Sequence, residues 1–110
     1  VARNAMHSHL SVVTLGEIVR GIEAVRLGSP RKAEMLAEWL ENLRVLFAGR
    51  ILDIDTSIAL RWGALGLARA DEPVDMLLAA TALEHDLTMV TRNVRHFEGI
   101  EGLRVENPFA

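Results

Sequence analysis

Apolar residues along the chain alternate between two periodicities, one typical of strands and one typical of helices. Short β-favouring runs predict strands at residues 9–13, 51–54, 87–91 and 103–105. Apolar positions three to four residues apart predict helices at residues 14–27, 30–47, 56–70 and 73–86, with a short turn or helix at 94–97. Strands that alternate with helices in this way predict an α/β fold with a mainly parallel sheet and right-handed crossovers.

The helix predicted at residues 30–47 has a wide apolar stripe, which includes Leu36, Leu40 and Leu43. Because only a short turn separates it from the helix before, the two should pack as a hairpin. Part of the stripe could face a partner subunit, or all of it could face the core of its own chain. No repeat or linker divides the chain, so residues 1–110 are expected to form a single domain.

Polar side chains occur near strand ends, where a parallel α/β sheet builds its ligand sites. Glu17 lies in the first turn of the predicted helix that follows the first strand, and Asp75 opens the most apolar helix. Asn93 comes just after the strand that ends at Thr91. Carboxylate and amide oxygens together suit a hard cation such as Mg²⁺ or Mn²⁺. The pattern therefore indicates a candidate metal site.

Each of these residues also has a purely structural interpretation. Glu17 could complete a capping box with Thr14, three residues earlier. Asp75 could complement the helix dipole, although a carboxylate at the mouth of a buried helix usually has a partner or an ion. Asn93 could be an ordinary turn or cap residue. A different metal hypothesis is that His7 and His9, on one face of a strand, bind Zn²⁺ or Ni²⁺ as a pair.

Composition narrows the possible functions. The net charge of −3 over 110 residues argues against a protein that coats nucleic acid through bulk charge. Eleven of the twelve basic residues are arginine, which suits phosphate contacts but which high-GC codon usage would also produce. The chain has no cysteine, and no apolar run is long enough to span a membrane. A cytoplasmic location is the expectation.

Several segments together resemble the PIN-domain family, and specifically its VapC-type toxins. They are SVVTLGEIVRGIE, FAGRILDID, PVDMLLAATALEHDLTMVTRNVRHFEG and the LRVENPF ending, in the family's order and spacing. The resemblance implies a PIN-like three-layer α/β fold and a Mg²⁺- or Mn²⁺-dependent endoribonuclease. Such a nuclease is usually the toxin of a toxin–antitoxin pair; it cleaves tRNA or other structured RNA, is neutralised by a small antitoxin protein and commonly forms a homodimer.

The family's site is a cluster of acids, and the resemblance assigns part of it to this chain. Glu17 matches the second acid and Asp75 the third, while Asn93 stands where the fourth would be and Thr91 matches a hydroxyl position beside the site. The first acid has no counterpart. It ends the family's first strand, which lies at the centre of the sheet, and the chain begins only nine residues before Leu10. The domain is therefore expected to be N-terminally incomplete.

Two main hypotheses follow. In the first, the chain is a metal-dependent ribonuclease with Glu17, Asp75 and Asn93 as its remaining ligands, and it is impaired by the missing acid. Arg92 and Arg95 are candidate contacts to RNA phosphates. In the second, the chain is a non-catalytic PIN remnant that acts through protein contacts, such as antitoxin binding. A third hypothesis is an unrelated α/β domain whose acids only cap helices.

Overall fold

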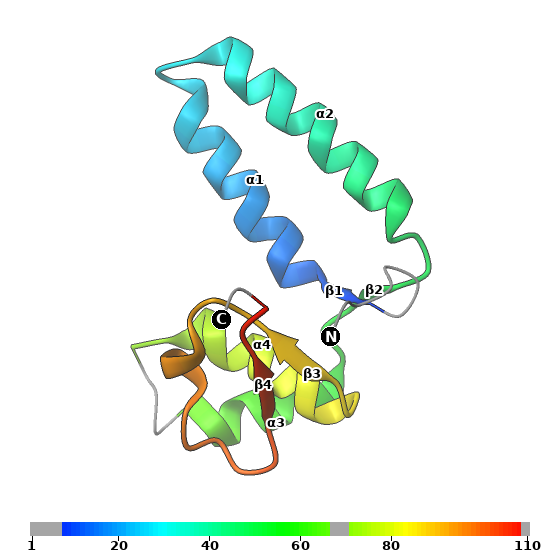
Figure 1. Ribbon diagram of the computed structural model, residues 1–110, viewed down its shortest axis with the longest axis vertical. Helices are drawn as coiled ribbons and strands as arrows, with labels where there is room; N and C mark the ends of the chain where they lie inside the picture. Colours follow the sequence, from blue (N-terminus) through cyan, green and yellow to red (C-terminus); the bar gives the residue numbers. More distant parts are fainter. Residues whose placement is uncertain (1–7, 67–70, 109–110) are drawn as a thin grey trace. The chain divides into compact units, whose positions relative to one another are not determined.

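The computed structural model describes residues 8–66 and 71–108, and its elements follow the predicted order (Figure 1). They are β1 (Leu10–Ser11), α1 (Val12–Arg26), α2 (Pro30–Leu46), β2 (Ile51–Leu52), α3 (Thr56–Gly66), α4 (Pro73–Glu84), β3 (Thr88–Val90), the 3₁₀ helix η2 (Val94–Phe97) and β4 (Arg104–Glu106). The α/β fold class is confirmed. The end of the helix predicted at 56–70 lies outside the described residues. The chain divides after Asp53 into two compact units, each of which is described by itself.

The N-terminal unit is the predicted hairpin of α1 and α2, which Figure 1 draws in blue to green, together with a parallel pair of strands. Ile22, Ala33 and Leu40 are its buried centre, and partly buried leucine and isoleucine side chains pack against them. Strand β1 pairs with β2 in the register Leu10 to Ile51 and Ser11 to Leu52. The stripe on α2 is thus divided between residues that face the core and residues that stay exposed.

Helix α1 begins at Val12, earlier than the sequence pattern predicts. Ser11 is its N-cap, because the Ser11 hydroxyl oxygen accepts a hydrogen bond of 3.1 Å from the backbone N–H of Val13. The prediction of a capping box between Thr14 and Glu17 is therefore wrong, and so is the placement of Glu17 in the first turn. The strand predicted at 9–13 shortens to two residues for the same reason, since the hydroxyl competes with the sheet for the backbone.

We expect Ser11→Ala to lower the free energy of unfolding by about 1 kcal/mol, because the variant loses the cap of α1. Ser29→Ala is the matched control: Ser29 is the N-cap residue of α2, but its side chain makes no capping hydrogen bond. Urea titration followed by circular dichroism measures both. Equal losses in the two variants would contradict the assigned cap.

The C-terminal unit packs α3 against α4 and places α4 next to η2 and β3. Asp55 caps α3 by accepting a hydrogen bond of 2.9 Å from the N–H of Ile58. The indole N–H of Trp62 donates to the carbonyl of Pro73 at 2.9 Å, which ties α3 to the start of α4. Helix α4 is the most apolar of the predicted helices, and its middle is buried: Met76, Ala79, Ala80, Thr81 and Ala82 are all buried. This burial holds the first turn of α4 in a fixed position within the unit.

The described strands form two separate parallel pairs, β1 with β2 and β3 with β4, and not one continuous sheet. The predicted parallel pairing of strands is confirmed, whereas the one sheet that the sequence predicted is replaced by two pairs among the described residues. Among the described residues no third strand pairs with either sheet, so neither grows beyond two strands. No helix in the described part of the chain is long and apolar enough to cross a membrane.

Candidate functional site

Asp75 lies in the first turn of α4, as the sequence predicts. Pro73 begins the helix, because its fixed φ suits the first helical position and its missing N–H is not needed there. Met76, the residue after Asp75, is fully buried, so α4 packs against the core from its first turn. Asp75 is thus a carboxylate on a rigid support at the N-terminal end of a buried helix.

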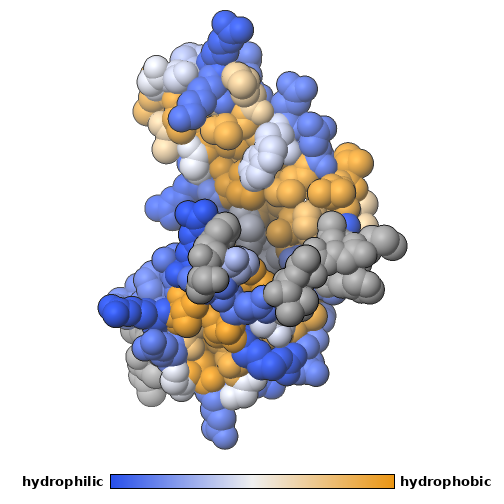
Figure 2. Space-filling model, in the orientation of Figure 1, coloured by the Kyte–Doolittle hydropathy of each residue, from blue (hydrophilic) through white to orange (hydrophobic). Residues whose placement is uncertain are grey.

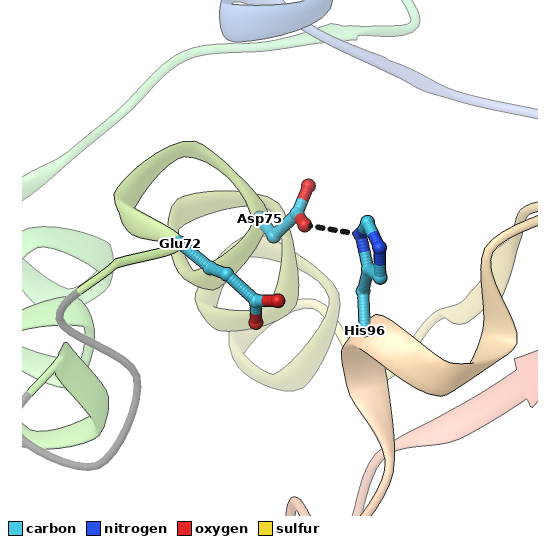
Figure 3. Close-up of side chains that lie close together, drawn as sticks. All are labelled: Glu72, Asp75 and His96. Atoms are coloured by element: carbon cyan, nitrogen blue, oxygen red, sulfur yellow. Dashed lines mark hydrogen bonds and ion pairs between the residues drawn. The ribbon is translucent and has the colours of Figure 1, made fainter.

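The side chain of Asp75 has a specific partner in His96, on η2. Nδ1 of His96 lies 2.8 Å from Oδ2 of Asp75, a contact that Figure 3 shows as a dashed line. The side chains remain 46% and 29% exposed respectively, so solvent and ions reach both. The pair joins two elements whose residues are 21 positions apart in sequence.

Glu72 stands at the N-cap position of α4, and its side chain lies close to those of Asp75 and His96 (Figure 3). Its side chain does not cap the helix, and its Oε2 atom is buried. Glu72, Asp75 and His96 each offer one ligand atom, and these atoms lie within 4.8 Å of one another. Two carboxylates and one imidazole at such separations can hold a metal ion.

Thr91, Arg92 and Asn93 form the segment between β3 and η2. The hydroxyl oxygen of Thr91 accepts a hydrogen bond of 3.0 Å from the backbone N–H of Asn93, which orders the turn that follows the strand. Asn93 directly precedes η2, but its side chain does not cap that short helix. Arg92, Asn93 and Arg95 are exposed. Arg92 and Asn93 therefore lead directly into η2, which carries Arg95 and His96.

Glu17 lies in the N-terminal unit, in the second turn of α1, and is exposed. Ser11 caps that helix, so the capping-box explanation for Glu17 no longer applies. Within the described residues the Glu17 side chain makes no hydrogen bond or ion pair. Its role as a metal ligand stays a prediction, since each unit is described by itself. For the alternative histidine pair, His7 lies outside the described residues and His9 is exposed.

The sequence pattern indicated neither Glu72 nor His96 as a site residue. The spacing of Glu72 and Asp75, three apart across a helix-starting proline, places both carboxylates on the first turn and could have indicated the pair. For His96 no local pattern exists, because its contact with Asp75 arises only when η2 packs on α4.

Comparison with known proteins gives consistent results. The PIN-domain family profile matches residues 3–103, nearly the whole chain. The tRNA(fMet)-specific endonuclease VapC of Salmonella typhimurium is 33% identical over 109 residues, which cover 94% of this chain and 77% of that protein. The chain thus spans about three quarters of the length of this relative.

Two solved structures show the same fold. FitAcB from Neisseria gonorrhoeae matches with a TM-score of 0.81 and 31% identity, over 97% of this chain and 79% of that one. The DNA-bound VapBC complex from Salmonella typhimurium matches with a TM-score of 0.71 and 30% identity, over 87% and 71% respectively. The motifs, the fold and these comparisons agree, and the chain belongs to the PIN-domain family, among its VapC-type toxins.

Proposed function

We propose that this chain is the nuclease of a toxin–antitoxin pair and that it cleaves RNA, tRNA foremost, in the cytoplasm with the help of a divalent cation. The observation that carries the proposal is Asp75, an accessible carboxylate at the start of a buried helix in a VapC-type sequence. The family match runs across both compact units, which supports residues 1–110 as one domain.

In this proposal Glu17, Asp75 and Asn93 hold Mg²⁺ or Mn²⁺. Two carboxylates and an amide oxygen, all of them at least partly accessible, fit the oxygen preference of these cations. A divalent cation bound there supplies the activation of water and the stabilisation of phosphodiester charge. His96 keeps the Asp75 carboxylate oriented through their 2.8 Å contact, and the Thr91 hydroxyl orders the turn that presents Asn93.

Arg92 and Arg95 are the proposed contacts to RNA. Both are exposed and flank Asn93, so they lie on the segment that also presents the proposed ligand. The planar guanidinium group matches phosphate oxygens with two parallel hydrogen bonds. Because the net charge of the chain is −3, local arginines rather than bulk charge would have to attract the RNA.

An antitoxin and a second copy of the chain are the proposed protein partners. The support is a set of exposed apolar side chains on the α1–α2 hairpin, where Figure 2 shows hydrophobic surface. They are Val19, Leu27, Met35, Trp39, Val45 and Leu46. Apolar surface of this extent on a helical hairpin is typical of protein interfaces. The same observation favours the second candidate function, a non-catalytic protein that only binds an antitoxin.

Cleavage of tRNA in the presence of Mn²⁺ tests the nuclease. We expect the chain to cut tRNA slowly with Mn²⁺, because one acid of the family's site has no counterpart, and we expect EDTA to stop this cleavage. Glu17→Gln should lower the rate about tenfold or more, because it removes a ligand charge from the metal site. Glu38→Gln, an exposed glutamate of α2, is the matched control and should keep the full rate.

Gel separation of end-labelled tRNA gives the rates. Equal rates for Glu17→Gln and the parent chain would remove Glu17 from the site. Absence of cleavage by a folded parent chain, with antitoxin binding retained, would support the non-catalytic alternative.

A further inference from the structure

We infer that Glu72, Asp75 and His96 bind one divalent transition-metal ion, with His96 as a nitrogen ligand. The inference rests on the proposed function only through Asp75, the one residue that this ligand set shares with the proposed set of oxygen ligands. It deepens the proposed function by naming the class of cation that the site prefers. The three residues all belong to the C-terminal unit, so the site needs no residue from the rest of the chain.

The distances among the three side chains suit direct coordination. Two neighbouring ligands of an octahedral ion, each about 2.1 Å from it, lie about 3.0 Å apart, and opposite ligands lie about 4.2 Å apart. Nδ1 of His96 and Oδ2 of Asp75 are 2.8 Å apart, close to the value for neighbouring ligands. The full set falls within 4.8 Å, so small rotations of the side chains complete the site. The cation would take the place of the proton that His96 now shares with Asp75.

The two elements that carry the ligands are anchored in the same core. Met76 directly follows Asp75 and is fully buried, while Phe97 directly follows His96 and is 4% exposed. Both belong to one hydrophobic cluster with Ala79. Since Asp75 and His96 each stand next to a buried anchor, the backbone holds this pair at its short separation without a metal, and binding costs little ordering.

Charge favours a cation at this position. Two carboxylates carry two formal negative charges, whereas the N-terminus of α4 contributes only about half a positive charge. Glu72 adds an oxygen in a buried environment, where the attraction between charges is stronger than in water.

The nitrogen ligand determines which cation the cluster prefers. Mg²⁺ prefers an all-oxygen shell, whereas a site with a nitrogen ligand favours first-row transition metals, in an affinity order that rises from Mn²⁺ to Co²⁺. We therefore expect Mn²⁺ and Co²⁺ to bind more tightly than Mg²⁺, and we expect this preference to depend on His96.

Binding of Mn²⁺ alone, followed by the loss of the electron paramagnetic resonance of free Mn²⁺, tests the inference. His96→Gln keeps an amide near Asp75 but removes the imidazole. It should weaken Mn²⁺ binding about tenfold or more. The affinity for Mg²⁺, measured by competition with Mn²⁺, should change much less. His85→Gln is the matched control, since His85 is an exposed histidine at the other end of α4. Glu72→Gln is a second variant and should also weaken Mn²⁺ binding.

Unchanged Mn²⁺ affinity in both His96→Gln and Glu72→Gln, with circular dichroism showing a folded chain, overturns the inference. The tRNA assay, run on the same samples, separates this result from the proposed function. Binding of Mn²⁺ that depends on His96 without any tRNA cleavage would refute the nuclease and keep the site. Cleavage that depends on Asp75, with Mn²⁺ binding independent of His96 and Glu72, would refute the site and keep the nuclease.

Discussion

Replacement of Asp75 by asparagine is expected to lower Mn²⁺-dependent tRNA cleavage by about 100-fold or more. Loss of a group that merely supports a ligand costs 10- to 100-fold in metal sites, and Asp75 is itself the proposed ligand shared by the oxygen cluster and the His96 cluster. The asparagine has nearly the same shape, so the packing of α4 behind it should be retained. Initial rates of cleavage at saturating Mn²⁺ give the measurement.

The matched control for this variant is Asp53→Asn. Asp53 is an exposed aspartate between β2 and α3, and it makes no hydrogen bond or ion pair with any residue the structure describes. The Asp53→Asn variant should cleave tRNA at the rate of the parent chain. Cleavage by Asp75→Asn at the parent rate would end the metal-site hypothesis, because Asp75 belongs to both proposed sets of ligands.

The second large effect is expected at Met76. Met76→Ala should lower the free energy of unfolding by about 2–5 kcal/mol, since a fully buried side chain is removed from the cluster that joins α4 to η2. Chemical denaturation monitored by circular dichroism measures the change. The loss should also weaken the contact between Asp75 and His96, because Met76 and Phe97 anchor these two residues.

Met35→Ala is the control that separates burial from residue type. Met35 lies on α2 and is 65% exposed, so its truncation should change the free energy of unfolding by no more than about 0.5 kcal/mol. If both methionine variants lose the same stability, Met76 is not an anchor of the core. The difference between the two variants is therefore the quantity to be measured.

The order of elements could be predicted because its causes are local. The apolar run after Pro73 predicts a buried helix with Asp75 in its first turn, and this is observed. The short helix at 94–97 is likewise observed as η2. Periodicity, proline and turn residues act over a few positions, so one sequence is enough to indicate them.

The start of α1 shows where local reasoning fails. Ser11 and Thr14 both offer a capping hydroxyl, and the sequence alone favoured Thr14 because Glu17 completes its motif. The fold selects Ser11, since β1 pairs with β2 only as far as Ser11 and the chain then turns into the helix. The capping-box explanation for Glu17 therefore no longer applies, and its role as a metal ligand stays a prediction.

By itself, the sequence determined the family, the parallel α/β class and the position of Asp75 at the mouth of a buried helix. Only the tertiary structure decided which side chains accompany Asp75. Glu72 reaches it across a single helical turn, but His96 is 21 residues away and arrives because Phe97 and Met76 bury their side chains in one cluster. Contacts of this kind depend on how elements pack rather than on the pattern within any one of them, so no local pattern predicts them.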